Sequence, residues 1–265
     1  EILGDTFISP SVYESIESWI RLTHGWDIRT EWICFSPGIV PAINLLILAF
    51  TKPQDRVIVQ TPVYFPFFSA VENHGRELVY NPLIYSNGKY EMDFDDLESK
   101  MDSTTKMLIL CNPHNPTGNV WSADGIRRIG EMCLAHDILL ISDEIHSDLV
   151  YSGYHHTPAA SISKEIAGNT ITCMAPSKTF NLAGLSTSFL IIPDEKLRIT
   201  YEKKLDQIHV GAGNIFGFVA MEDGATLPIT PGGCANPNRF GMCGWAAQAR
   251  TLSAEPRKSA GSRRS

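Results

Sequence analysis

Short apolar runs alternate with amphipathic segments along most of the chain. Seven runs rich in β-branched and other apolar residues have the length and composition of buried strands. They are WICF (32–35), VIVQ (57–60), LVY (78–80), MLIL (107–110), ILLIS (138–142), TITC (170–173) and FLII (189–192). Because helical patterns lie between several of them, the sequence predicts an α/β fold with a mainly parallel sheet and helices on both faces.

Helical spacing of apolar residues predicts the helices between these strands. Three helices are expected over residues 10–23, 122–135 and 195–209. Ser9 precedes the first and is its expected N-cap. In the second, Ile126, Ile129 and Cys133 share one face, as expected for a helix that packs on a sheet.

The end of the chain differs in composition from the rest. Residues 221–265 contain six Lys or Arg and three Asp or Glu, whereas the whole chain of 265 residues has 22 and 29. The segment is rich in turn-forming residues and has no helical or strand periodicity. We therefore expect one domain over 1–220 and an irregular or disordered tail over 221–265, which we interpret as truncated or out-of-frame sequence.

Composition and charge exclude several classes of function. The formal net charge of −7 disfavours nucleic acid as a partner, because phosphate binding needs a basic surface. The longest apolar run, 39–50, contains a proline and an asparagine and is too short to cross a membrane. The six cysteines form no C-x-x-C pair and are expected to be mostly buried free thiols. Without a signal-peptide pattern at its start, the chain is expected to be cytoplasmic.

Candidate chemistry lies directly after the predicted strands, where open α/β sheets bind ligands. The segment SPGIVPAIN follows WICF, with Gly38 in a tight turn and Pro41 in the first turn of the next helix. The free N–H groups at such a helix N-terminus can bind a phosphate. An ordinary strand-to-helix turn can contain the same residues, so this pattern alone does not distinguish a phosphate-binding turn from an ordinary one.

Two further strand ends carry polar side chains. In CNPHNPTG (111–118), Asn115 offers an amide to a ligand oxygen, unless the asparagines only cap their own turn. In DEIHSD (143–148), three carboxylates and a histidine follow a strand: Asp143, Glu144, His146 and Asp148. Such a cluster indicates either a ligand or metal site or a solvated strand end.

A lysine follows the next strand, within MAPSKTFNLAGL (174–185). Beside apolar surface, Lys178 would be an amine nucleophile able to form a Schiff base with a carbonyl. A lone lysine is more often a surface residue. Here, however, a phosphate-binding turn, an amide, a carboxylate and a lysine are all expected at one sheet edge, and pyridoxal phosphate needs these four groups.

The motifs HNPTG (114–118), SDEIH (142–146) and SK (177–178) resemble those of fold-type I pyridoxal-phosphate enzymes of the class I/II aminotransferase superfamily. The resemblance extends over about residues 9–218. Within the superfamily, HGWDI (24–28), QTPVYFPFF (60–68) and SDEIHSDLVY (142–151) are most similar to the cystathionine β-lyase or cysteine-S-conjugate β-lyase branch.

The resemblance implies a role for each matching residue. Lys178 would hold the cofactor covalently and move the substrate's α-proton, Asp143 would pair with the pyridine nitrogen, and Asn115 would bind the phenolic oxygen. Tyr64 would stack on the ring, although packing within an aromatic cluster would also account for it. The complete set of implied cofactor-binding residues is Gly38, Ile39, Val40, Tyr64, Asn115, Asp143, His146, Ser177 and Lys178.

The implied activity is cleavage of L-cystathionine or a related cysteine S-conjugate to a thiol, pyruvate and ammonia. The alternatives are an aminotransferase, which would use the same residues, and an inactive cofactor-binding remnant. The implied partners are a small amino-acid substrate and a second copy of the chain in a homodimer; no nucleic acid, membrane or metal is expected.

Several positions depart from the family pattern. Ala175 and Ser186 stand where a phosphate-binding serine and arginine are common, and Asp5 stands where the lyase branch has a tyrosine. Arg239 and Arg250 lie in unmatched sequence and do not inherit the role of binding the substrate carboxylate. The small C-terminal domain of the family is expected to be absent.

Overall fold

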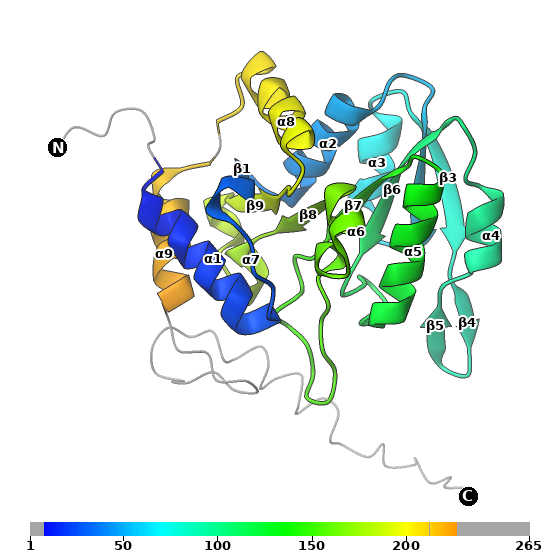
Figure 1. Ribbon diagram of the computed structural model, residues 1–265, viewed down its shortest axis with the longest axis horizontal. Helices are drawn as coiled ribbons and strands as arrows, with labels where there is room; N and C mark the ends of the chain where they lie inside the picture. The colour runs from blue at the N-terminus through cyan, green and yellow to red at the C-terminus, as the bar shows by residue number, and fades with distance from the viewer. Residues whose placement is uncertain (1–7, 212, 227–265) are drawn as a thin grey trace, which may run out of the picture. The chain divides into compact units, whose positions relative to one another are not determined.

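The structure is a computed structural model that describes residues 8–211 and 213–226 (Figure 1). The predictions for Asp5, Arg239, Arg250 and the segment 227–265 lie outside the described residues.

A seven-stranded sheet forms the centre of the domain, in the order β1-β9-β8-β7-β6-β2-β3. Its strands are β1 (Ile33–Ser36), β2 (Arg56–Thr61), β3 (Glu77–Pro82), β6 (Thr105–Cys111), β7 (Leu139–Asp143), β8 (Thr170–Met174) and β9 (Ser188–Ile191). Only β9 runs antiparallel to its neighbours, β1 and β8; the other pairs are parallel. Each of the seven predicted strands is therefore confirmed, as is the mainly parallel α/β sheet.

The central strands are apolar throughout because both faces of the sheet are covered. In β6, Met107 and Ile109 pack into the core on one face, while Leu108 and Leu110 pack into the core on the other. A strand that is buried on both sides has no polar face, which is why the sequence shows continuous apolar runs here.

Helices cover both faces of this sheet, as predicted (Figure 1). They are α1 (Pro10–His24), α2 (Ile39–Phe50), α3 (Pro66–Glu72), α4 (Phe94–Ser99), α5 (Ala123–Ala135), α6 (Lys164–Gly168), α7 (Pro176–Thr179), α8 (Glu195–Gln207) and α9 (Ile215–Thr226). Helices α2, α3 and α8 contribute to the core on one face, and α4 and α5 to the core on the other. Helices α1 and α9 pack together and form a third apolar cluster with β1, β8 and β9.

Side-chain caps begin several of these helices, including the cap predicted at Ser9. Ser9 Oγ accepts a hydrogen bond from Ser11 N at the start of α1, and Ser122 Oγ accepts one from Gly125 N at the start of α5. Such caps satisfy N–H groups that have no partner within the helix.

The structure also has elements that the apolar pattern does not predict. They include the short helices α3, α4, α6 and α7 and a small hairpin made of β4 (Ile84–Ser86) and β5 (Lys89–Glu91). Helix α9, which begins at Ile215 and continues past residue 220, is another.

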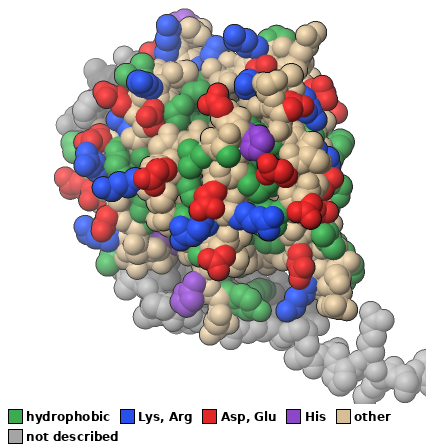
Figure 2. Space-filling model, turned by 45° about the vertical axis from the view of Figure 1, so that its right-hand side comes forward, with side chains coloured by type: hydrophobic (Ala, Val, Ile, Leu, Met, Phe, Trp, Pro, Cys, Tyr) green, Lys and Arg blue, Asp and Glu red, His purple; other side chains and the backbone are tan. Residues whose placement is uncertain are grey.

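The cysteines and the surface charges of the described residues are arranged as the composition indicates. Cys34, Cys111, Cys133 and Cys173 are buried and free, as expected. Acidic and basic side chains are interspersed on the face shown in Figure 2. None of the described helices has both the length and the apolar character needed to cross a membrane.

The topology brings several strand ends to one edge of the sheet. Strands β1 and β8 are both antiparallel to β9, so they run in the same direction, and β7, β6 and β2 are parallel to β8. The carboxyl ends of these five strands therefore lie at the edge where β9 begins. The candidate site is at this edge.

Candidate active site

A cavity of about 310 Å³ lies at this edge, within the size range of small-molecule sites. All nine residues that the sequence implies for cofactor binding line it: Gly38, Ile39, Val40, Tyr64, Asn115, Asp143, His146, Ser177 and Lys178. Segments more than 100 residues apart in the sequence thus meet around a single cavity.

The N-terminus of α2 forms one wall of the cavity. Gly38 is its N-cap, with φ 134° and ψ 161°, a conformation that is essentially restricted to glycine. The first backbone bond of the helix runs from Ala42 N to Gly38 O, so the N–H groups of Ile39 and Val40 have no partner within the helix. Two free N–H groups at the positive end of a helix make this wall suitable for an anion.

Two serines from neighbouring strands hold the turn before α2. Ser36 and Ser188 are paired in the register of β1 and β9. Gly38 N donates to Ser188 Oγ (3.2 Å), which donates to Ser36 O (3.0 Å), and Ser36 Oγ donates to Gly38 O (3.2 Å). These bonds fix the turn to the sheet, so the anion-binding wall is preformed.

Asp143 ends β7 and is a buried carboxylate that lines the cavity. Burial raises its pKa to about 7; the bond that Oδ1 accepts from Ile145 N (3.1 Å) lowers it, the negative Glu144 raises it and Lys178 lowers it. A buried carboxylate disfavours its charged form unless a positive group is close. A cationic group of a ligand would supply that partner.

Lys178 lies in the one-turn helix α7, directly after β8, and its side chain is exposed. Its positive charge lowers the pKa of Asp143 and, after the larger effect of burial, that of His146. The amine is therefore close enough to act electrostatically on both side chains. The structure brings the lysine, the carboxylate and the imidazole to one cavity, as their positions after predicted strands indicate.

The loop that follows β6 contains two asparagines with different surroundings. Asn112 accepts a bond from Trp121 N (3.3 Å) and donates one to Thr157 O (3.2 Å), so it holds the loop in place. Asn115 lines the cavity instead. Asn112 therefore bonds to distant parts of the chain instead of capping its own turn, and Asn115 has a position at the cavity.

Tyr64 lies in an aromatic cluster and also at the cavity, the two positions considered for it from the sequence. Its ring lies 5.5 Å from that of Phe65 and 6.0 Å from that of Phe67, within an aromatic cluster. It is also 36% exposed and lines the cavity. The ring is therefore packed in the aromatic cluster and also partly exposed at the cavity.

The four polar residues of DEIHSD are divided between three environments. Asp143 and His146 line the cavity, Glu144 is buried against His156, and Asp148 contacts α1. No group of three or more His, Cys, Asp or Glu side chains among the described residues is arranged to hold a metal ion. Asp143 is buried and His146 is half-buried, so they are not part of a solvated strand end, and both line the cavity.

The cavity also includes Cys111 and Thr187, which sequence patterns do not single out, and Ala175 and Ser186, the two positions that depart from the family pattern. Cys111 pairs with Asp143 in the register of β6 and β7 and accepts a bond from Asn115 N (3.3 Å). Burial, and then the charge of Asp143, raise the pKa of its thiol, so it is an unreactive part of the wall. Ser186, with φ 45°, and Thr187 line the cavity just before β9. The sequence shows that they precede a predicted strand. It does not show that β9 is antiparallel, and only this direction brings the start of β9 to the edge where the other strands end.

Comparison with known proteins agrees with this architecture. The family model of aminotransferase class I and II matches residues 1–210. Cystathionine beta-lyase PatB of Bacillus subtilis is 45% identical over 222 residues, which is 83% of this chain and 57% of that protein.

Solved structures of two bacterial proteins superpose on the chain. Cystalysin of Treponema denticola, whose structure contains pyridoxal 5'-phosphate, is 36% identical with a TM-score of 0.83, over 94% of this chain and 60% of that one. The C-S lyase of Staphylococcus hominis, in an external aldimine form with L-cycloserine, is 37% identical with a TM-score of 0.79, over 85% and 56%. The chain thus spans a little more than half the length of these relatives.

A mainly parallel seven-stranded sheet with helices on both faces is the large domain of fold-type I enzymes. The chain belongs to the aminotransferase class I and II family. The resemblance stated from the motifs is confirmed.

Proposed function

We propose that this protein is a pyridoxal-phosphate-dependent carbon-sulfur β-lyase that acts on L-cystathionine or a related cysteine S-conjugate. One observation carries the proposal: Lys178, Asp143, Asn115 and the N-terminus of α2 line a single cavity. The similarity to PatB and to the C-S lyase supports the choice of reaction.

The residues of the cavity fit the cofactor group by group. The free N–H groups of Ile39 and Val40 match the phosphate, and the amine of Lys178 matches the aldehyde. The carboxylate of Asp143 matches a protonated pyridine nitrogen, which would add a positive charge to that of Lys178 and favour the ionised form of this buried group. When bound, the cofactor withdraws electrons from the substrate's α-carbon.

Each of the remaining tasks falls to a residue of the chain. Lys178 Nζ would hold the aldehyde carbon of the cofactor and, when free, would accept the proton from the substrate's α-carbon. The negative charge of Asp143 would favour a protonated ring nitrogen. Tyr64 would pack against the ring, and Asn115 and His146 would donate hydrogen bonds to ring or substrate oxygens.

In the lyase reaction, loss of the α-proton is followed by breakage of the bond between the β-carbon and sulfur. The sulfur leaves as a thiol, and addition of water to the remaining fragment gives pyruvate and ammonia. An aminotransferase is the second candidate, since it uses the same residues and the matching family model describes aminotransferases. It releases a keto acid and keeps the carbon-sulfur bond intact.

The test uses the wild-type protein, Lys178→Ala, and a control, Lys89→Ala, in which the lysine is exposed on the hairpin strand β5. Wild type and the control are expected to develop the visible absorption of covalently bound pyridoxal phosphate, and Lys178→Ala is not. With L-cystathionine, equal amounts of thiol and pyruvate would support the lyase.

The other outcomes separate the alternatives. Keto acid formed without thiol, in the presence of a second keto acid, would identify an aminotransferase. Cofactor binding without turnover would identify the inactive remnant. If the wild-type protein gave no lysine-dependent absorption, the proposed function would be wrong. A homodimer, also part of the proposal, is tested by light scattering on the same samples.

A further inference from the structure

Asp148, which lines a second cavity and not the large one, joins its own loop to two other segments of the chain. Its Oδ1 accepts hydrogen bonds from Trp19 Nε1 (3.3 Å) and His24 Nε2 (2.9 Å), both on α1. Its Oδ2 accepts a bond from Thr179 Oγ1 (2.6 Å). Thr179 is the residue after Lys178, so one carboxylate links α1 to the helix that carries the lysine.

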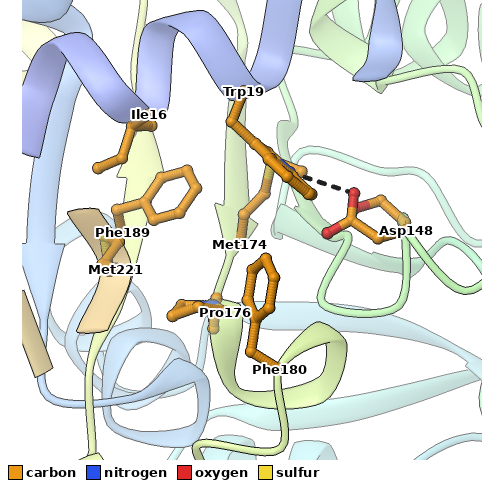
Figure 3. Close-up of a pocket in the computed structure, with 10 residues that line it drawn as sticks. Ile16, Trp19, Asp148, Met174, Pro176, Phe180, Phe189 and Met221 are labelled. Atoms are coloured by element: carbon orange, nitrogen blue, oxygen red, sulfur yellow. Dashed lines mark hydrogen bonds between the residues drawn. The ribbon is translucent and has the colours of Figure 1, made fainter. Parts of the chain in front are cut away.

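Trp19 strengthens this link by contacting the residue after Thr179. Figure 3 shows its indole between Asp148 and Phe180, with the hydrogen bond to Asp148 marked. The rings of Trp19 and Phe180 lie 5.4 Å apart, edge to face at 61°. The second cavity, of about 30 Å³ and lined in part by Pro176 and Phe180, lies beside these contacts. Thr179 and Phe180 are therefore both held from the direction of α1.

The helix α7 cannot hold Lys178 by itself. It has four residues, and the backbone bonds that close it are Phe180 N to Pro176 O (2.9 Å) and Leu182 N to Ser177 O (3.0 Å). A single helical turn is not stable in isolation, because its few bonds do not offset the loss of backbone entropy. The direction of the Lys178 side chain therefore depends on contacts with other parts of the fold.

The Asp148 carboxylate is suited to such a contact. Burial alone would raise its pKa, but the bonds and charge of His24 and the bonds from Thr179 and Trp19 outweigh burial and lower it. The ionised group can only accept, so all three partners are donors, and bonds to a charged acceptor are short and strong. His146, two residues earlier, lines the large cavity, so the same loop contributes to both sides.

We propose that Asp148 is a positioning residue which, through its hydrogen bond to Thr179, fixes the direction from which Lys178 enters the cofactor cavity. Asp148 itself touches neither cofactor nor substrate. The inference rests on the proposed function, because it concerns how the lysine meets the cofactor.

The test removes the hydroxyl of Thr179 with little change of shape. Thr179→Val deletes the donor, Thr179→Ser retains it, and Thr200→Val is a matched control on α8, where the Thr200 hydroxyl bonds only locally to Lys196 O (2.8 Å). Asp148→Asn removes the charge from the other side of the bond. Amide hydrogen exchange over residues 176–182 is measured on the cofactor-free protein, and the rate of covalent attachment of pyridoxal phosphate is measured separately.

We expect Thr179→Val to speed exchange at the amides of Phe180 and Leu182 at least tenfold and to slow covalent attachment at least fivefold. Thr179→Ser should stay within twofold of wild type, and exchange in α5 should not change in any variant. A structural role alone would lower global stability and affect α5 as well. Asp148→Asn should act in the same direction as Thr179→Val.

Two results would overturn the proposal: unchanged exchange at α7 in Thr179→Val, or faster exchange with an unchanged rate of attachment. Equal exchange and attachment rates in Thr179→Val and Thr179→Ser would also overturn it. Failure of the proposed function looks different, since the wild-type protein itself would then show no covalent attachment.

Discussion

Glu144 and His156 form a buried pair in which Oε2 lies 2.7 Å from Nε2. The other carboxylate oxygen of Glu144 accepts bonds from Ser142 Oγ (2.8 Å) and Ala159 N (2.9 Å). Glu144 thus ties β7 to the chain that returns after the loop, directly beside Asp143. Its contribution is to hold the loop rather than to contact a ligand.

Replacement of Glu144 by alanine should therefore be costly. Three buried donors would lose their acceptor, and we expect the free energy of unfolding to fall by about 3–5 kcal/mol. The chain contains a matched control, since Glu98 and His136 also lie 2.7 Å apart but the Glu98 side chain is 55% exposed. Glu98→Ala should cost less than about 1 kcal/mol. Urea unfolding of both variants checks the difference, and equal losses would contradict it.

Asp143→Asn should make the cofactor-free protein more stable at alkaline pH. The pKa of Asp143 is raised to about 7 in the folded state, so the folded protein retains a proton there that the unfolded chain has lost. Stability is therefore lost as the pH rises from about 4 to about 7, by up to about 4 kcal/mol. The asparagine variant escapes this loss, so its advantage should be large at pH 8 and small near pH 4.

Thermal unfolding of wild type and Asp143→Asn across this pH range measures the effect. Asp27→Asn, at an exposed aspartate, is the control. A stability difference that stays constant with pH would contradict the prediction. Added pyridoxal phosphate should stabilise wild type more than Asp143→Asn, because the amide has no charge to offer the ring nitrogen.

Gly38→Ala should weaken both the fold and anion binding. A Cβ at Gly38 would lie 3.5 Å from Pro41 Cδ, so space is sufficient, and the cost comes from the positive φ of 134°. We expect a loss of about 1–3 kcal/mol in unfolding free energy. Gly211→Ala, at a glycine with open space and without a positive φ, is the control. Inorganic phosphate should stabilise wild type and the control but not Gly38→Ala, as thermal shifts would show.

Gly130→Ala tests the packing of α5 on α6. A Cβ there would lie 2.7 Å from Cδ1 of Ile166, closer than atoms can approach without movement. Although alanine favours helices, overpacking should dominate and reduce the unfolding free energy by about 1–3 kcal/mol. Gly168→Ala, at the end of α6 with nothing within 4 Å, should be neutral or slightly stabilising. Equal stabilities of the two variants would show that Ile166 moves aside freely.

The strands could be predicted because their residues are apolar on both faces, but their directions could not. The run FLII (189–192) has the same composition in a parallel or an antiparallel strand, and β9 proved to be antiparallel. The hairpin of β4 and β5 was missed because its residues are mostly exposed and show no apolar alternation. Helix α9 begins IFGFVAM, which is apolar on all sides and therefore has no amphipathic period.

The candidate site was predictable where its residues lie at or shortly after the end of a strand. Asp143 is the last residue of β7, and Gly38, Asn115 and Lys178 lie two to four residues after their strands; parallel strands bring such positions to one edge. The roles of Glu144 and Asp148 were not predictable. They depend on which way each side chain leaves the loop, and in the case of Asp148 this is set by Trp19, 129 residues earlier in the chain.

The contact between Gly38 N and Ser188 Oγ spans 150 positions of sequence, and β1 has β9 as its one neighbour in the sheet. During synthesis, the strand that leads into the anion-binding turn emerges early and has to wait for most of the domain before it can pair. Contacts at such long range form slowly, because a large loop must be closed first. The turn whose N–H groups we propose to hold a phosphate is therefore completed only after most of the domain has folded.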